Sequence, residues 1–231
     1  STARQDFTSM GRLFGSLAGG RELTEEVLKE WFYYFFQCTE CRRCSVYCPY
    51  GIDTAEVTMM ARELMNLVGL NINWILEPVA NCQRTGNHLG IQPHTYKDNV
   101  QFLCDELADV TGVKLDPPIN RKGAEVLFVI PSADYFADPG TYTFCGYLML
   151  FEHIGLDYTL SSYASDGGNF GLFNSVENLK RLNWKIYHEA KRLGVKWILG
   201  GECGHMWRVI NQYMDTMNGP ADFLEVPRSP I

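Results

Sequence analysis

The spacing of hydrophobic residues divides the chain into two parts. Up to about Leu115, apolar residues recur with helical spacing and no run is typical of a strand. Capping residues support two of the helices, because Thr24 is followed by two glutamates and Asp53 precedes Glu56 at capping-box spacing. The predicted helices run from Thr24 through the aromatic block Trp31–Phe36 to a group of cysteines, from Asp53 to Gly69, and from Asp98 to Thr111.

The spacing changes after a linker, Leu115–Gly123, that is rich in proline, polar residues and glycine. Short apolar runs then alternate with helical patterns, which predicts a parallel sheet with right-handed crossovers. The predicted strands are Ala124–Ile130, Leu156–Ser161 and Val195–Gly200, and the helices are Thr141–Ile154, Val176–Leu193 and Met206–Met217. We therefore predict an α+β chain, with a helical module at 1–116 and an incomplete α/β domain at 124–231 that belongs to a longer protein.

Composition restricts the possible functions. The chain has 231 residues, 46% of them hydrophobic, and 27 acidic against 20 basic side chains. The sequence contains no basic tract of the kind that would indicate binding to nucleic acid. The longest apolar run, Trp31–Phe36, is far shorter than the ~20 residues that cross a bilayer, and no secretory signal is recognisable. We expect an intracellular protein with no transmembrane segment of its own, and docking onto a membrane partner stays open.

Four of the eight cysteines lie close together and carry the strongest chemical signal. Cys38, Cys41, Cys44 and Cys48 are followed by Pro49, which gives the spacing C-x2-C-x2-C-x3-C-P. This is the spacing of bacterial-type ferredoxins, in which the first three thiolates bind one [4Fe–4S] cluster. Structural zinc sites usually divide their thiolates into two separated pairs and do not need the proline. The motif therefore predicts an iron–sulfur cluster.

The fourth ligand of this cluster is open between two residues. In two-cluster ferredoxins the fourth cysteine binds the other cluster, but no intact second motif is present here. Cys48 can complete the set, and so can Cys82, which begins a segment, Cys82–Pro93, with the spacing of a decayed second copy. Cys104 and Cys145 lie in apolar helical patterns and are expected to be packing residues.

Three loops should converge at the carboxyl edge of the predicted sheet, where such sheets bind ligands. They are Pro131–Asp134, Tyr163–Asn169 and Gly200–His205. The third loop carries the most chemistry, because Cys203 lies near the start of a helix whose dipole favours a thiolate and His205 follows two residues later. Cys203 and His205 are therefore the predicted catalytic residues, and Cys203 is also a candidate metal ligand.

Several segments give the chain a specific family resemblance over nearly its whole length. They are the cysteine motif, RTGNHLG (Arg84–Gly90), FVIPSADYFADPGTY (Phe128–Tyr142) and GGECGHMWRV (Gly200–Val209). With these segments the chain resembles the DsrK family. These are the cytoplasmic iron–sulfur subunits of a membrane-bound redox complex associated with dissimilatory sulfite reduction, and they are related to heterodisulfide reductase catalytic subunits.

The resemblance implies a function and partners. Electrons would pass from a quinol pool through a haem-bearing membrane subunit to the [4Fe–4S] cluster, and then to a second, catalytic iron–sulfur cluster. That centre would reduce a disulfide or trisulfide on a small sulfur-carrier protein. The resemblance also implies a heterodisulfide-reductase-type cysteine-rich domain and a cytoplasmic location, attached to the inner membrane through partner subunits.

The cysteine motif that holds the catalytic centre in heterodisulfide reductases is eroded here. Its lone cysteine falls near Ser132, its cysteine pair near Ala164 and Ser165, and only Cys203 remains of the final pair, with Gly200 in the other position. Two other functions stay open: an iron–sulfur subunit of a complex that oxidises glycolate, lactate or glycerol-3-phosphate, and a docking module in which the cluster is structural.

Overall fold

The computed structural model describes residues 24–201 and 203–225. They form two compact units, of which the first contains residues 24–72 with Phe173–Ser175, and the second contains Asn73–Leu172 and the residues from Val176 onward. The domain division predicted at residues 116–124 stays a prediction.

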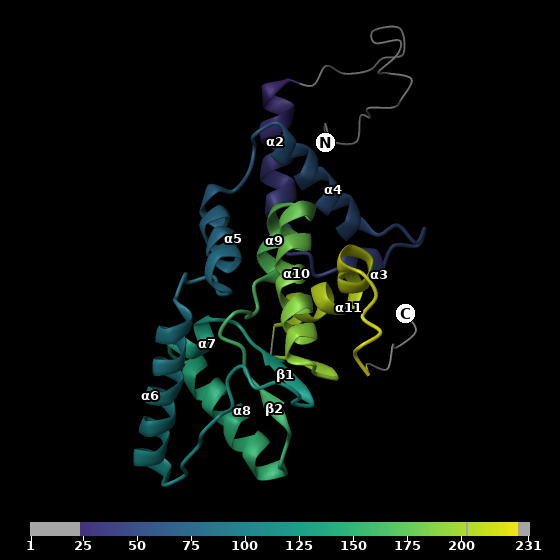
Figure 1. Ribbon diagram of the computed structural model, residues 1–231. Coiled ribbons are helices and arrows are strands. Elements are labelled where there is room, and N and C mark those ends of the chain that lie inside the picture. The colour runs from purple at the N-terminus through teal and green to yellow at the C-terminus, as the bar shows by residue number, and fades with distance from the viewer. Residues whose placement is uncertain (1–23, 202, 226–231) are drawn as a thin grey trace, which may run out of the picture. The chain divides into compact units, whose positions relative to one another are not determined.

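The helices of the first unit begin where the capping residues place them (Figure 1). Thr24 accepts a hydrogen bond from the Val27 amide at the start of α2 (Glu25–Phe36), and the Asp53 carboxylate accepts from the Ala55 and Glu56 amides at the start of α4 (Thr54–Leu67). A short helix, α3 (Arg43–Val46), lies between them in sequence. Helix α4 packs against α2 through its buried face. The two predicted helices of this unit are confirmed.

The second unit contains a three-stranded parallel sheet with strand order β2-β1-β3. Val126 and Leu127 of β1 lie opposite Tyr158 and Thr159 of β2 in register, and all of β1 pairs with β3. The strands are β1 (Val126–Val129), β2 (Tyr158–Thr159) and β3 (Trp197–Gly200), and the helices are α5 (Asn73–Thr85), α6 (Pro93–Thr111), α7 (Ala133–Phe136), α8 (Gly140–Ile154), α9 (Gly168–Asn174, whose end belongs to the first unit), α10 (Val176–Leu193) and α11 (Gly204–Asn218). The described chain is thus mostly helical, and the predicted parallel sheet is confirmed.

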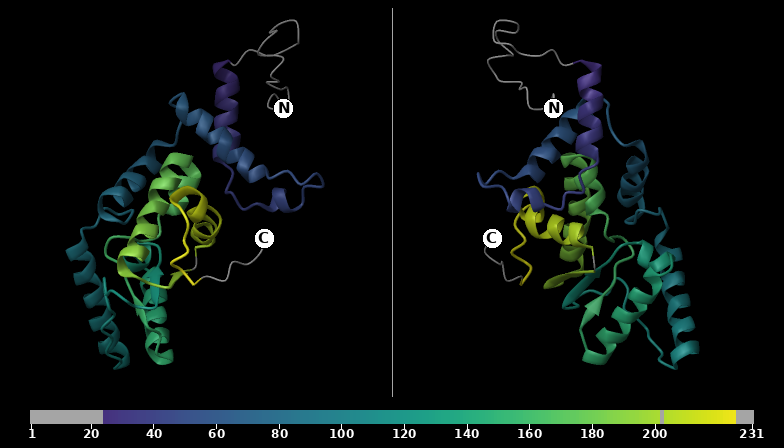
Figure 2. Two further views of the ribbon diagram at one scale, coloured as in Figure 1. Left: turned by 45° about the vertical axis from the view of Figure 1, so that its right-hand side comes forward. Right: turned by 180° about the vertical axis from the view of Figure 1, so that it is seen from behind.

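Alternate residues of β1 enter two hydrophobic cores, because successive side chains of a strand point to opposite faces. Val126 and Phe128 pack with α6 and α8, whereas Leu127 and Val129 pack with α10 and α11. Figures 1 and 2 show the two pairs of helices on opposite faces of the sheet. Cys104 lies in the first of these cores and is 1% exposed, as predicted for a packing residue.

Several elements differ from the predictions. Helix α6 begins at Pro93 rather than Asp98, because a proline at the first helical position has a suitable backbone angle and needs no amide partner there. Helix α5 was not predicted and contains Pro78 in its interior. Helices α7 and α9 were also not predicted. No helix within the described ranges combines the length and the apolar character that crossing a bilayer requires.

Candidate functional site

The cysteine motif lies in a loop of the first unit that leaves the end of α2. Cys38 is the second residue after α2, Cys41 lies in the loop, Cys44 is in α3 and Cys48 follows α3. Cys41 and Cys44 are exposed, and Cys38 and Cys48 are half-buried. Glu40 and Arg42 have positive φ angles of 56° and 59°, so a residue with left-handed backbone lies on each side of Cys41. Non-glycine residues adopt this region infrequently, and such geometry is found where a loop has a special shape to keep.

Hydrogen-bond donors surround the sulfur atoms of this loop. The Glu40 amide donates to Cys38 Sγ at 3.4 Å, and the Thr54 hydroxyl donates to Cys44 Sγ. The pKa of Cys41 is lowered, first by a hydrogen bond from the Arg43 amide and then by one from the Thr39 side chain. Hydrogen bonds to the charged form favour that form. These hydrogen bonds thus favour the thiolate of Cys41, which is the form in which cysteine binds metals.

Asp53 fastens the cysteine loop to the start of α4. Its carboxylate accepts hydrogen bonds from the Ser45 hydroxyl at 2.8 Å and from the Arg42 guanidinium, as well as capping α4. Desolvation alone would raise the pKa of Asp53, but hydrogen bonds from Ser45, the Glu56 amide and Arg42 outweigh it and lower the pKa. A single carboxylate therefore holds α3, the preceding turn and α4 together.

The four cysteines fit an iron–sulfur cluster by the chemistry of their donors. They supply four thiols from one stretch of the chain, and hydrogen-bond donors are directed at the sulfur atoms of Cys38, Cys41 and Cys44. In residues 24–201 and 203–225, however, no three histidine, cysteine, aspartate or glutamate side chains are gathered closely enough to hold a metal ion. The fit therefore rests on ligand type and local hydrogen bonding, and not on sulfur atoms already brought together.

In the second unit, the three predicted loops converge at the carboxyl edge of the sheet. The Asp166 amide donates to the Ile130 carbonyl at 3.0 Å, and Pro131 and Asp166 form an isolated parallel bridge. The Gly201 amide donates to the Val129 carbonyl at 3.0 Å. These contacts join the segments that follow β1, β2 and β3 and confirm the predicted meeting of the loops.

The positions of the eroded motif meet at this edge, but they are filled by a serine network. The Ser132 and Ser165 hydroxyls lie 2.8 Å apart, the His88 amide donates to Ser132, and the Ser165 hydroxyl donates to the Gly86 carbonyl at 3.1 Å. The cavity beside Ser165 has a volume of only about 10 Å³, which is about the space of one water molecule. The residues present do not fit a second iron–sulfur cluster at this place.

Cys82 lies on α5 in the second unit and is 3% exposed. A Cβ atom on Gly167 would lie 2.5 Å from the Cys82 sulfur, so the thiol is enclosed by the loop after β2. Burial raises the pKa of Cys82 to about 12, the Asp166 charge adds to this rise, and Lys185 opposes it. Thr85, at the next position of the decayed-copy alignment, has a local partner, since its hydroxyl donates to the Asn81 carbonyl at 3.0 Å.

Cys203 caps α11 at the carboxyl edge, and His205 lies in the first turn of that helix. The prediction that the helix dipole favours a thiolate at Cys203 was wrong. Burial, followed by the Asp166 charge, raises the pKa of Cys203 to about 11, and the backbone amides of Met206 and His205 only partly offset this. Asp166 therefore influences both Cys82 and Cys203. Sequence reasoning missed this role of Asp166, although the residue lies inside the predicted loop Tyr163–Asn169.

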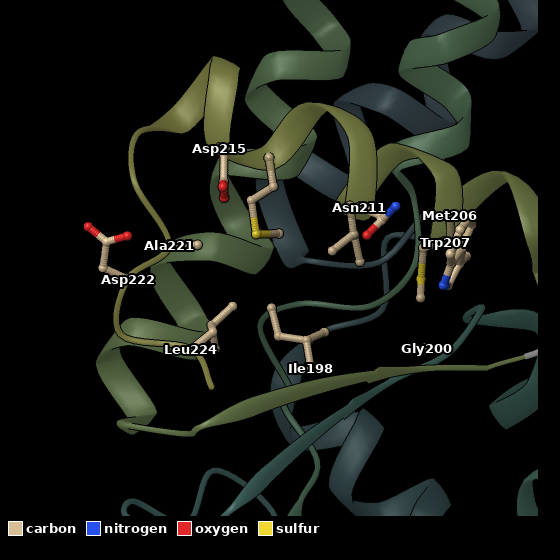
Figure 3. Close-up of a pocket in the computed structure, with 11 residues that line it drawn as sticks. Ile198, Gly200, Met206, Trp207, Asn211, Asp215, Ala221, Asp222 and Leu224 are labelled. Atoms are coloured by element: carbon tan, nitrogen blue, oxygen red, sulfur yellow. The ribbon is translucent and has the colours of Figure 1, made fainter. Parts of the chain in front are cut away.

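A cavity of about 510 Å³ lies between β3, α11 and the segment that follows α11 (Figure 3). Its lining combines apolar side chains with the carboxylates of Asp215 and Asp222, and its volume is in the range of small-molecule sites. Neither Cys82 nor Cys203 is among its lining residues. The cavity and the chemically active side chains of this unit are thus separate features.

Comparison with known proteins gives two close relatives. The Hdr-like menaquinol oxidoreductase iron–sulfur subunit of Archaeoglobus profundus is 53% identical over 229 residues, which are 97% of this chain and 41% of that protein. The Hdr-like menaquinol oxidoreductase iron–sulfur subunit 2 of Archaeoglobus fulgidus is 53% identical over 224 residues, which are 95% of this chain and 40% of that protein. The chain thus spans about two fifths of the length of the curated relatives it matches. No family model and no solved structure matches it.

Proposed function

We propose that this chain is part of the iron–sulfur subunit of an Hdr-like menaquinol oxidoreductase, an electron-transfer enzyme associated with a membrane. The observation that carries this proposal is the 53% identity to two iron–sulfur subunits of such enzymes, which extends over nearly all of this chain. The cysteine loop supports it independently, because its ligand types and its hydrogen bonds to sulfur suit an iron–sulfur cluster.

Cys38, Cys41, Cys44 and Cys48 are the proposed ligands. Their spacing favours a [4Fe–4S] cluster, and when bound such a cluster would accept and pass on single electrons. Cys48 is preferred to Cys82 as the fourth ligand, because Cys48 belongs to the same loop and the same compact unit as the other three. Cys82 is enclosed by Gly167 in the second unit and its raised pKa disfavours the thiolate.

The family resemblance extends this proposal to partners and substrate. As in the DsrK family, we propose that electrons come from a quinol pool through a haem-bearing membrane subunit and finally reduce a disulfide or trisulfide on a small sulfur-carrier protein. The subunit would then be cytoplasmic and attached to the inner membrane through its partners. Cys203 and His205 are the proposed site residues of the second unit, because the loop after β3 places both at the start of α11.

The test of the cluster uses the full-length protein purified without oxygen. Iron and acid-labile sulfide are counted, and EPR spectra are recorded after reduction, for the wild type and for Cys41→Ser and Cys48→Ser. Cys145→Ser is the matched control, because it removes a half-buried thiol outside the motif. Both motif variants should lose iron and the EPR signal while the control keeps them. Full iron content in Cys41→Ser would contradict the proposal, and full content in Cys48→Ser would exclude Cys48 as a ligand.

The substrate is tested in the purified complex. Menaquinol oxidation coupled to reduction of the sulfur-carrier trisulfide should be observed, and Cys203→Ala should reduce its rate. Activity with glycolate, lactate or glycerol-3-phosphate instead would favour the organic-acid alternative. A cluster that no physiological donor reduces would favour the docking module.

A further inference from the structure

A buried ion pair lies directly behind the cysteine loop of the first unit. The side chains of Arg62 on α4 and Glu40 in the loop are 1% and 0% exposed, and Arg62 Nη1 lies 3.4 Å from Glu40 Oε1. Removing two charges from water is costly, and the attraction between them repays that cost only when further hydrogen bonds satisfy the ions. The surroundings of the pair therefore indicate what it does.

The Arg62 guanidinium is held by the backbone at the end of α2. Its Nε and Nη2 atoms donate to the Phe35 carbonyl at 3.0 and 2.7 Å, and Nη2 also donates to the Cys38 carbonyl. The rings of Phe36 and Phe173 lie 5.5 and 5.6 Å from the guanidinium carbon. Arginine suits such a place because its planar fork donates in several fixed directions at once. Arg62 thus fixes the backbone position of the first cysteine.

Glu40 couples the same pair to the sulfur atoms. It lies between Cys38 and Cys41 in sequence, and its own amide donates to Cys38 Sγ at 3.4 Å. Arg62 Nη2 donates to the Cys38 carbonyl, so the guanidinium charge lies next to the backbone of the first cysteine, and Glu40 balances that charge in the ion pair.

We propose that Arg62 and Glu40 act together as positioning residues that set the electrostatic potential at the cysteine loop, and thereby the reduction potential of the iron–sulfur group the loop binds. This inference rests on the proposed function. Reduction adds negative charge to the group, so a nearby positive charge favours the reduced form and a negative charge disfavours it. Reduction potentials of iron–sulfur clusters depend on net charge and on hydrogen bonds near the sulfur atoms.

The charge effect predicts opposite shifts for the two partners. Glu40→Gln keeps the shape of the side chain but leaves the Arg62 charge unbalanced, so the midpoint potential should rise. Arg62→Gln leaves the Glu40 charge unbalanced, so the midpoint should fall. The double variant removes both charges and should return close to the wild-type value. Arg62→Lys keeps the positive charge but loses the planar guanidinium. The sign of its electrostatic effect on the midpoint potential should therefore be kept, while the iron content should fall.

The experiment is a redox titration of the full-length protein, followed by EPR, with iron content measured for each variant. Glu25→Gln is the matched control, because it removes the same charge from an exposed side chain on α2 and should leave the midpoint unchanged. Opposite shifts for the two single variants support the inference. Equal midpoints in all variants, or shifts of the same sign, overturn it even when iron is fully bound. A wild-type protein without iron or an EPR signal overturns the proposed function as well, which separates the two failures. If one single variant does not fold, the sign of the shift in the other decides.

Discussion

Gly86 provides the sharpest test of how the carboxyl edge of the sheet is built. It lies between α5 and α6 with a φ angle of +87°, and a Cβ atom there would lie 1.9 Å from the Tyr163 carbonyl oxygen and 2.2 Å from the carbonyl carbon. The Gly86 carbonyl also accepts hydrogen bonds from the amide and the hydroxyl of Ser165, at 2.9 and 3.1 Å. Gly86→Ala should therefore separate this loop from the segment that follows β2.

The cost has two parts. A non-glycine residue in the left-handed region loses about 1–2 kcal/mol of stability. Inserting a methyl group against well-packed atoms costs about 1–3 kcal/mol more, and here the obstacle is backbone, which cannot rotate away as a side chain can. Gly86→Ala should thus lower the free energy of unfolding of the second unit by about 2–5 kcal/mol.

Gly112→Ala is the matched control. Gly112 ends α6 with a φ angle of +75°, but no atom lies within 4 Å of its Cβ position. It should show only the backbone cost, and the entropy that alanine removes from the unfolded chain is the same for both variants. Denaturant unfolding followed by circular dichroism gives the two free energies from the shift in midpoint at constant slope. The reasoning is refuted if Gly86→Ala is no more destabilising than Gly112→Ala.

Three further predictions follow from the cysteines and from the cap of α4. The pKa of Cys82 is raised from 9.0 to about 12, so the thiol ionises at lower pH in the unfolded chain than in the folded one, and the free energy of unfolding falls as the pH rises from about 9 toward 12. Cys82→Ala should reduce this fall when unfolding midpoints are measured against pH. Asp166→Asn removes a charge that raises the pKa of Cys203, so iodoacetamide should alkylate Cys203 faster at pH 9 than in the wild type, and an unchanged rate would contradict the coupling. Asp53→Ala should destabilise the first unit by about 0.5–2 kcal/mol through the lost cap, whereas Asp53→Asn should keep most of that stability in the same unfolding measurement.

The elements that the sequence predicted well depend on local rules. Thr24 and Asp53 accept hydrogen bonds from the amides two or three residues later, and this geometry is complete within one helical turn. Strand β1 was also predictable, because a short apolar run bounded by polar and glycine residues suits a strand buried on both faces. Such patterns require no knowledge of distant parts of the chain.

The roles that sequence reasoning missed depend on tertiary contacts. Asp166 acts on Cys203 because the segments following β2 and β3 meet, and on Cys82 because α5 lies against the loop after β2. Lys185 acts on Cys82 from α10. The spacing of segment Cys82–Pro93 left Cys82 open as a cluster ligand, because the burial of Cys82 on α5 depends on contacts outside that segment. The raised pKa of Cys203 was missed for the same reason, because the dipole of α11 is a local effect whereas burial and Asp166 are not.

The environments of the cysteines limit which part of the chain can do thiolate chemistry. In the first unit, amide and hydroxyl donors lower the pKa of the exposed Cys41. The Cys41 thiol therefore loses its proton more easily, which favours metal binding. In the second unit, burial and the Asp166 charge raise the pKa of both Cys82 and Cys203 well above neutrality. The exposed loop of the first unit is therefore better suited to thiolate chemistry than the buried thiols of the second unit.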